Sequence, residues 1–284
     1  MTLLSLLQTS LSTIAAILGV MALISGIELL IPLHARTKLH RAHRGPNLAL
    51  TFITFAANVG LNGALMVLLL HLDRAKFGIL RWIPLGPWVA AVIAFVVLDL
   101  SFYVAHVCMH AIPALWRVHR VHHSDPVVDV TTTIRQHPLE GLIRYAFMGA
   151  FACAFGVGLG AFVAYRAWSA IGGLLEHANV RVPRWVGAAL AWITTWPDLH
   201  KVHHSRDVRE CDTNYGNIFS WFDRLFGTFT PASRVENVVC GLDGFDEPGS
   251  QSTAGLLALP FRVVPARYAG SRAPANAAPH EPSA

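Results

Sequence analysis

Three long apolar stretches do most to limit what this chain can fold into. They cover residues 11–33, 48–70 and 86–108. Each is long enough for a helix that crosses the hydrocarbon core of a bilayer, which takes about 20 apolar residues. Only 14% of the 284 residues are charged and 54% are hydrophobic, whereas an ordinary soluble domain is about 25% charged. The sequence therefore predicts an all-α, polytopic membrane protein with about three full spans.

A fourth apolar region, residues 142–175, is too long for one simple span. The segment "GVGLG" at 156–160 divides it into two parts, and glycines are residues at which helices commonly end or turn. Irregular backbone at membrane depth must be buried within protein. We therefore expect two half-length helices that form a hairpin and enter and leave the membrane on the same side.

The loops predict which side of the membrane each segment faces. The loop at 34–45 carries four basic residues and no acidic one. Cytoplasmic loops have such an excess of positive charge, so we expect this loop, the end of the third span near His110 and both ends of the hairpin at the cytoplasmic face. The formal net charge of +5 fits contact with anionic lipid. No basic run interleaved with aromatic residues lies outside the apolar stretches, so no nucleic-acid partner is expected.

The sequence divides into three regions. Residues 1–85 hold the first two spans, and residues 86–230 hold the third span, the hairpin and the histidine motifs described next. Residues 231–284 form a C-terminal extension, whose last part, 271–284, is rich in alanine and proline and has little to bury. We expect that last part to be disordered, and the first apolar stretch to be a retained span because no basic segment precedes it.

Two nearly identical hexapeptides, "HRVHHS" at 119–124 and "HKVHHS" at 200–205, each contain three histidines. A further pair, His106 and His110, lies at the end of the third span on one helix face. Imidazole is the commonest side-chain ligand for iron, zinc and copper. Eight histidines exceed the about four to six coordination positions of one ion. We therefore expect a helical metal-binding cap with two ions, in which each triplet serves one half of a dinuclear site.

Other metal motifs are missing from the sequence. It contains no ExxH, which soluble carboxylate-rich di-iron bundles use, and no HExxH of zinc proteases. The ligand set is therefore expected to be dominated by nitrogen. Five further histidines lie in loops or in the tail and are expected to be interfacial or solvated: His34, His40, His43, His71 and His280.

Around the histidines the sequence resembles the fatty acid hydroxylase and sterol desaturase superfamily of integral-membrane di-iron oxygenases, whose pattern is HxxxH, HxxHH and HxxHH. The resemblance includes "DLSFYVAHVCMH" (99–110), "RQHPLE" (135–140), "HANVRVP" (177–183) and "DTNYGNIFSWFDRLFGTF" (212–229). These segments are more similar to sterol desaturase-like and alkylglycerol monooxygenase-like members than to the cytochrome-fused sphingolipid hydroxylases.

The spacing and the resemblance together imply a set of metal ligands. Eight belong to the three motifs: His106, His110, His119, His122, His123, His200, His203 and His204. The resemblance adds His177 as a ninth, because family members place another histidine before the last HxxHH. His137, which a proline follows, is left open between direct ligation and a supporting or structural role.

Four polar residues are candidates to support the site. Asp99 precedes His106 by seven residues and so lies almost on the same helix face. A buried carboxylate in a span normally has a partner, and we expect Asp99 to orient a ligand histidine through its far N–H; a hydrogen bond between packed helices is the alternative. Asp212, Asn214 and Tyr215 follow the last triplet and are expected in a similar role.

Two further features are less specific. Asn179, in "HANV", is a weaker candidate for the same supporting role. Trp221, Phe222, Leu225 and Phe226 are typical either of an amphipathic helix lying on the membrane interface or of ordinary packing.

The resemblance implies an O2-dependent oxidoreductase that hydroxylates or desaturates a lipid C–H bond with two iron ions. The substrate, a sterol, a fatty acyl chain or an ether lipid, would come from the bilayer. A separate donor such as a ferredoxin, a cytochrome b5-like protein or a reductase would supply electrons. Zinc can fill nitrogen sites in purified samples but is redox-inert. Two alternatives stay open: a zinc-dependent membrane hydrolase that consumes water, and a metal transporter, whose ligands would be spread near mid-membrane.

Overall fold

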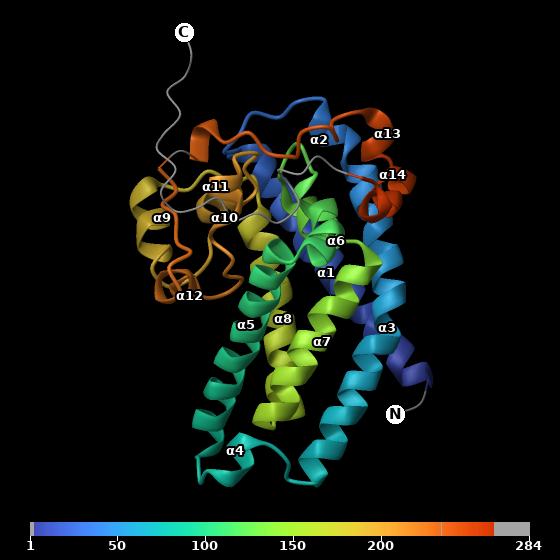
Figure 1. Ribbon diagram of the computed structural model, residues 1–284, viewed down its shortest axis with the longest axis vertical. Coiled ribbons are helices and arrows are strands. Elements are labelled where there is room, and N and C mark those ends of the chain that lie inside the picture. Colours follow the sequence, from blue (N-terminus) through green and yellow to red (C-terminus); the bar gives the residue numbers. More distant parts are fainter. Residues whose placement is uncertain (1–2, 234, 264–284) are drawn as a thin grey trace.

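The computed structural model describes residues 3–233 and 235–263, and this part of the chain is helical (Figure 1). Five long helices dominate it: α1 (Leu3–Leu30), α3 (Arg44–Arg74), α5 (Pro87–Ala111), α7 (Pro138–Phe155) and α8 (Leu159–His177). Extended pairing among the described residues is limited to the isolated bridges Pro32–Val180 and Ser205–Cys240. The predicted all-α fold class is confirmed for this part of the chain.

Two segments are long and apolar enough to cross a membrane, Leu39–Trp82 and Pro87–Ala111. Large apolar side chains face outward along them, among them Val67 and Trp88, which are 67% and 84% exposed. In α1 the apolar part, Ile14–Leu30, is shorter than a full span. Two of the three predicted spans are therefore confirmed as apolar helices of sufficient length, and the third stays a prediction.

The predicted hairpin is present, and a glycine makes its turn. Gly156 ends α7 in the left-handed conformation with φ of 68°, and α8 begins at Leu159. A Cβ atom at Gly156 would clash with the backbone of Phe77 and Gly78, so the turn packs directly against the chain between α3 and α4 (Ile79–Trp82). The two helices have 18 and 19 residues, not half a span, because α7 already begins at Pro138, before the apolar run.

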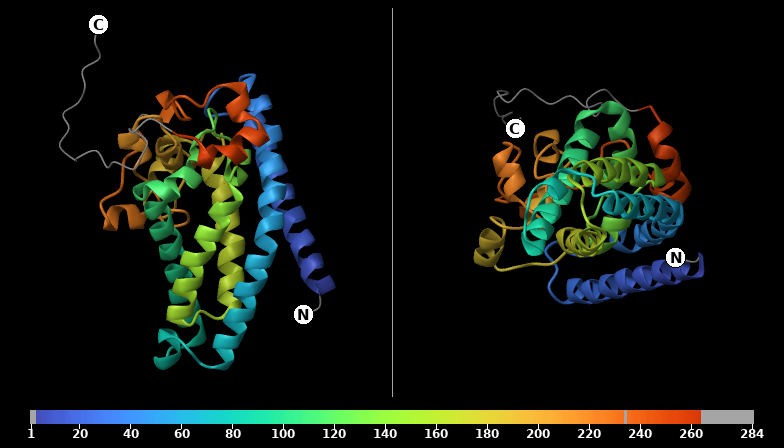
Figure 2. Two further views of the ribbon diagram at one scale, coloured as in Figure 1. Left: turned by 45° about the vertical axis from the view of Figure 1, so that its right-hand side comes forward. Right: turned by 90° about the horizontal axis from the view of Figure 1, so that it is seen from below.

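Four of the long helices, α3, α5, α7 and α8, pack side by side around one apolar core, and α1 packs against α8 through a second cluster. Helix α7 contacts both α3 and α5, and α8 contacts α5 and α1. Figure 2 shows α1 on the outside of this group. The interior is filled by fully or almost fully buried apolar side chains, including Leu65, Leu69, Leu98, Met148 and Phe162. This packing fixes the ends of α5 and α8, which carry three of the histidines.

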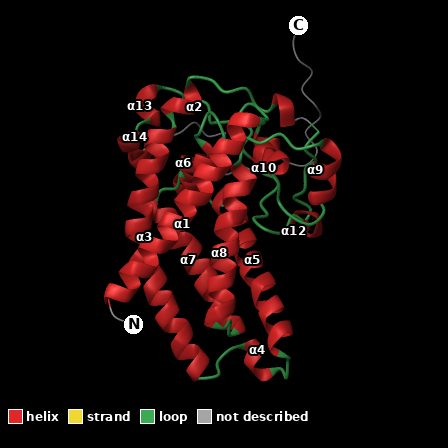
Figure 3. Ribbon diagram, turned by 180° about the vertical axis from the view of Figure 1, so that it is seen from behind, coloured by secondary structure: helices red, strands yellow, loops and turns green. Residues whose placement is uncertain are grey.

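Short helices and loops form a cap at one end of the long helices (Figure 3). Its α-helices are α2 (Leu39–Ala42), α6 (Pro113–His123), α9 (Arg184–Leu190), α10 (Pro197–His203), α11 (Val208–Cys211), α12 (Trp221–Leu225), α13 (Pro248–Gln251) and α14 (Thr253–Ala258). Three 3-10 helices complete it: η1 (Val130–Ile134), η2 (Val235–Asn237) and η3 (Leu259–Phe261). Helix α4 lies at the opposite end (Figure 1).

The described part of the C-terminal extension packs onto this cap. Leu256 and Leu259 are fully buried in a cluster with Trp116 and Val121 of α6. The guanidinium of the buried Arg120 donates hydrogen bonds to the carbonyl oxygens of Leu259, at 2.5 Å, and Arg262, at 2.7 Å. The extension therefore covers α6, which carries the first histidine triplet. The predicted disordered segment, 271–284, lies outside the described residues.

Candidate metal centre

All nine predicted histidine ligands lie in the cap or at the helix ends that enter it. His106 and His110 are in the last turns of α5, and His177 is the last residue of α8. The triplets lie on α6 and on α10 with the residue that follows it. The side chains are all buried, with at most 3% of each residue exposed. Proline at the first position of α5, α6 and α10 fixes where these helices begin.

The nine histidines form two clusters. The first contains five imidazoles whose ligand nitrogens lie within 4.8 Å of one another: His106, His110, His119, His123 and His203. The second contains four: His122, His177, His200 and His204. In the second cluster the Nε2 atom of His177 lies 3.0 Å from that of His122 and 2.9 Å from that of His200. The structure thus has two adjacent places where imidazole nitrogens converge.

Each triplet contributes to both clusters, which corrects the prediction that each would serve one half of the site. In α6, His119 and His123 point into the first cluster and His122 into the second; in α10 and the residue after it, His203 belongs to the first cluster and His200 and His204 to the second. The cause is helix geometry, because residues four apart share a face while a residue between them is rotated away. The two triplets therefore join the two clusters together.

The facing ring nitrogens of His106 and His203 indicate that the first cluster can hold a cation. The Nδ1 atom of His106 donates to the carbonyl oxygen of Tyr215 at 2.9 Å, and that of His203 donates to the carbonyl oxygen of Thr213 at 2.7 Å. A carbonyl only accepts, so both rings carry their proton on Nδ1. Their Nε2 atoms nevertheless lie 3.0 Å apart. In the neutral rings two lone pairs face each other, an arrangement that a shared cation stabilises.

The spacing of the Nε2 atoms also fits a metal ion. Bonds of about 2.1 Å from an ion to two imidazoles, at about a right angle, separate the two nitrogens by about 3.0 Å. The observed Nε2 separations are 3.1 Å between His106 and His119, 3.1 Å between His110 and His123, and 3.2 Å between His119 and His123. Burial holds the pKa values of His119, His123 and His203 well below the usual range. These rings are therefore neutral, as metal ligands must be.

The loop after the second triplet orients the first cluster. Besides the two carbonyls of Thr213 and Tyr215, the carboxylate of Asp212 lies 3.1 Å from Nδ1 of His110. The partner of the far ring nitrogen sets the tautomer and aim of a ligand histidine. Asp212 and Tyr215 thus occupy the supporting position expected of them, Tyr215 through its backbone. Asn214 instead braces the loop through Leu199, Thr228 and Thr230.

A supporting residue that the sequence did not reveal is Glu140, in the first turn of α7. Its carboxylate oxygen lies 3.2 Å from Nδ1 of His119, at ion-pair distance but without the alignment of a hydrogen bond. Arg144 holds the same oxygen from the next turn, at 2.7 Å. Glu140 and Arg144 have the i, i+4 spacing of a helical ion pair. This pair beside "HPLE" was the signal available in the sequence.

The structure does not support the prediction that Asp99 orients a histidine. Its carboxylate accepts hydrogen bonds from the backbone N–H groups of Ile218, at 3.3 Å, and Phe219, at 3.0 Å, and from the hydroxyl of Tyr165, at 3.2 Å. Helix-face spacing placed it correctly near His106 along α5. This spacing could not show that the 216–219 segment lies against the same face of α5 and that its backbone N–H groups hydrogen-bond to the Asp99 carboxylate. Asp99 therefore holds the loop, which in turn supports the cluster.

Other predicted candidates lie outside the clusters. The Nδ1 atom of His137 accepts from the N–H of Leu139 at 3.2 Å, so this residue caps α7 and is not among the clustered histidines. Asn179 donates its backbone N–H to Glu28 at 2.8 Å and exchanges hydrogen bonds with the backbone of His34. Asn179 therefore ties the end of α8 to α1.

Two histidines that were expected to be interfacial or solvated are buried. His40 is 4% exposed and His43 is 3% exposed. The ring of His43 lies 2.9 Å from a carboxylate oxygen of Asp125 and 3.3 Å from one of Asp129. Loop position in the sequence did not reveal these carboxylates, which come from the segment after the first triplet. His71 is exposed as expected, and His280 lies outside the described residues.

Some hydrophobic residues in and next to α12 are packed in the interior, and others are exposed as they would be on an amphipathic helix at the membrane interface. Phe222 is 2% exposed and packs beside Tyr103. Leu225 and Phe226 are 66% and 54% exposed. One face of α12 is therefore packed and the other presents apolar side chains outward.

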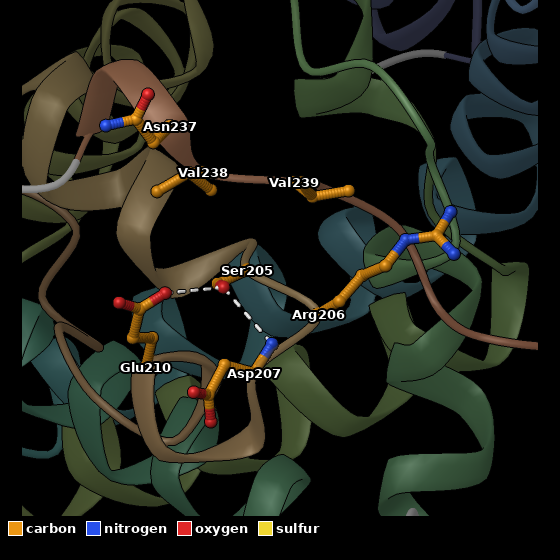
Figure 4. A pocket seen from close by; sticks show the side chains of 7 residues that line it. All are labelled: Ser205, Arg206, Asp207, Glu210, Asn237, Val238 and Val239. Carbon is orange, nitrogen blue, oxygen red and sulfur yellow. Dashed lines mark hydrogen bonds between the residues drawn. The ribbon is translucent and has the colours of Figure 1, made fainter. Parts of the chain in front are cut away.

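A polar pocket opens beside the second triplet (Figure 4). Ser205, the residue after His204, donates to the carboxylate of Glu210 at 2.6 Å and accepts from the N–H of Asp207 at 3.1 Å. Arg206 pairs with Asp243 and Asp246 outside it. Ser205, Asp207 and Glu210 are thus engaged with one another, and no clustered histidine lines the pocket.

The fold and the clusters define a class of protein: a helical protein of long apolar helices, capped by two adjacent clusters of buried histidines that could bind metal. Residues 91–228 match the sequence model of the fatty acid hydroxylase family, and these residues contain all nine clustered histidines. Through this region the chain is similar to the fatty acid hydroxylase family, within the superfamily that also contains the sterol desaturases.

Several curated proteins are similar to part of this chain. An ornithine lipid hydroxylase from Rhizobium tropici is 33% identical over 153 residues, which is 54% of this chain and 45% of that protein. An alkylglycerol monooxygenase from Danio rerio is 29% identical over 175 residues, covering 60% of this chain and 36% of that protein. The human alkylglycerol monooxygenase is 29% identical over 52% of this chain and 32% of its own length. The chain thus spans less than half of each of these relatives, and no solved structure matches it.

Proposed function

We propose that the protein is an integral-membrane, O2-dependent lipid hydroxylase with two iron ions, one held by each histidine cluster. The observation that carries the proposal is the pair of lone-pair nitrogens on His106 and His203, 3.0 Å apart, in the first of two adjacent clusters. Iron bound there would supply the redox chemistry with O2 that oxidises an unactivated C–H bond, which redox-inert zinc cannot do.

The chain's own residues hold and orient this centre. Four helices, α5, α6, α8 and α10, each contribute histidines to it, so the relative position of the two clusters is fixed by the packing of the whole cap. Carbonyls of the 213–215 loop, with Asp212 and Glu140, keep ring nitrogens directed inward. The burial of all nine rings excludes bulk water from the clusters.

The proposed substrate is a lipid that reaches the centre from the bilayer. The clusters lie at the end of apolar, outward-facing helices, and relatives of this region are named for ornithine lipid and alkylglycerol. We infer a lipid with a polar head group whose chain is hydroxylated. The basic 34–45 loop predicts a cytoplasmic position for the clusters, where a separate electron-donor protein would dock.

The two alternative functions fit the geometry less well. A catalytic zinc site keeps an open position beside about three protein ligands, whereas these clusters hold five and four imidazoles. A transport pathway would distribute ligands along several spans near mid-membrane, whereas these histidines gather at one end of the helices. Both observations support an oxygenase centre.

Comparative lipid profiling tests the proposal. A strain that lacks the gene, the same strain complemented with the wild-type gene, and one complemented with a His122→Ala variant are grown under isotopically heavy O2. Hydroxylation predicts a lipid species that gains one heavy oxygen atom in the wild-type complement only. A loss of two hydrogens instead would assign desaturation. Identical lipid profiles in all three strains would refute an oxygenase acting on the lipids of that membrane.

A further inference from the structure

The two clusters differ in how their positive charge would be balanced. Behind the first cluster stand two carboxylates, Glu140 at His119 and Asp212 at His110. In the second cluster, the Nδ1 atoms of His122, His200 and His204 have no hydrogen-bond partner, and that of His177 is used by the carbonyl oxygen of Gly173 at 2.7 Å. The second cluster also has one imidazole fewer. An ion there would be left with a larger uncompensated charge in a buried site.

One carboxylate does reach the edge of the second cluster. Glu176 precedes His177 at the end of α8 and is 3% exposed. Its Oε1 atom lies 3.9 Å from Nε2 of His200, which is the nitrogen that His200 directs into the cluster. Its Oε2 atom is buried and has no hydrogen-bond partner. The carboxylate is thus placed on the metal side of the ring of His200.

No basic side chain in the described part of the chain balances the charge of the Glu176 carboxylate. No lysine or arginine there lies within ion-pair distance of it. Oε1 also lies 3.7 Å from Nδ1 of His177, but that nitrogen already has its acceptor. A buried carboxylate without a partner is costly, and such groups are normally paired or bind metals.

We propose that Glu176 provides an oxygen ligand to the metal ion of the second cluster. The two sites are then chemically unequal, five nitrogens in one and four nitrogens with one carboxylate oxygen in the other. This inference rests on the proposed function in assuming two ions. An anionic oxygen halves the net charge of a divalent ion bound by neutral imidazoles.

The test measures metal retention in the full-length protein, loaded anaerobically with iron(II) in detergent and challenged with increasing chelator. Wild type is expected to hold two ions per chain. Glu176→Gln keeps the size of the side chain but removes its charge, and it is expected to lose one ion at least about 100-fold more easily, beyond the 10–100-fold typical of supporting residues. Glu236→Gln, at an exposed surface carboxylate, is the matched control and should match wild type.

A second substitution assigns the lost ion to its cluster. His122→Ala already removes a nitrogen from the second cluster, so adding Glu176→Gln to it should cause little further loss. Adding Glu140→Gln to it should instead loosen the remaining ion. A Glu176→Gln protein that holds two ions with the wild-type chelator curve would overturn the role of Glu176 and leave the proposed function standing. Wild type that holds fewer than two ions would overturn both.

A measurement on wild type covers the case in which Glu176→Gln does not fold. Infrared difference spectra of the metal-free protein before and after addition of zinc(II) alone report carboxylates that become ligands. A shifted carboxylate stretching band at two ions per chain is expected. An unchanged carboxylate region with two zinc ions bound would overturn the proposal without touching the histidine assignment.

Discussion

His122 and His123 are neighbours in α6, yet their rings stand perpendicular to each other, with 5.5 Å between ring centroids and an interplanar angle of 90°. They point into different clusters. His203 and His204 repeat the relationship at 5.6 Å and 89°. Each adjacent pair thus bridges the two clusters, so a movement of α6 or α10 would change both sites together.

This relationship gives different outcomes for two substitutions that the sequence alone would treat as equivalent. His203→Ala removes a nitrogen from the first cluster and His122→Ala removes one from the second. Each variant is expected to bind one ion per chain firmly and to lose O2-dependent turnover by at least about 100-fold. Metal analysis after dialysis checks the stoichiometry, and His71→Ala, at an exposed residue, is the control. Loss of both ions from each variant would show that the clusters cannot bind separately.

Glu140→Gln tests how the first cluster is oriented. The carboxylate lies between Arg144 and His119, and the neutral amide cannot polarise the ring in the same way. Metal affinity at the first cluster and turnover are expected to fall by about 10–100-fold. Chelator titration and turnover of the purified protein measure the two effects. Asp212→Asn, whose carboxylate is 25% exposed, should have a smaller effect, and an unchanged Glu140→Gln protein would show that His119 is oriented by packing alone.

Much of the fold and the clustered histidines could be predicted from the sequence because both rest on local spacing. Apolar length revealed α3 and α5, and the "GVGLG" glycines located the hairpin turn at Gly156. The HxxxH and HxxHH spacings identified every residue of both clusters except His177, which the family resemblance supplied.

What the sequence could not show depends on contacts between distant segments. Glu140 meets His119 across the α6–α7 connection, and His43 meets Asp125 from 82 residues away. The local sequence of Glu140 indicates only its i, i+4 ion pair with Arg144, and that of His43 indicates no carboxylate partner. The assignment of each triplet to one half of the site failed for a related reason, because it ignored the rotation of neighbouring residues around a helix.

Asp99→Asn separates structural support from orientation of a ligand. The two carboxylate oxygens accept from the N–H groups of Ile218 and Phe219, and an amide leaves one of these donors facing an NH2 group. We expect a loss of about 1–3 kcal/mol in the free energy of unfolding with both ions retained. Thermal unfolding in detergent and metal analysis measure these effects, and Tyr165→Phe is a milder companion variant. Selective loss of one ion at unchanged stability would restore the ligand-orienting role.

His43→Ala is expected to damage the protein although the residue lies in a basic loop far from the motifs. Its ring fills the space between Asp125 and Asp129, and all three side chains are buried. Contacts with His43 hold the pKa values of both carboxyls below their usual range, although burial alone would raise them. Removing the ring leaves two buried carboxylates with one partner fewer, at a cost of about 3–5 kcal/mol.

That loss should appear as a lower unfolding temperature of the metal-free protein, where bound metal contributes nothing to stability. Because the carboxyl pKa values are depressed in the folded state, the stability that this contact provides is present above the unfolded pKa of the carboxyls and is lost as the pH falls through their folded values. The difference between wild type and His43→Ala should therefore shrink at acidic pH. A His43→Ala protein with wild-type stability at neutral pH would show that Asn47 and Arg44, which also contact these carboxylates, stabilise them without the imidazole.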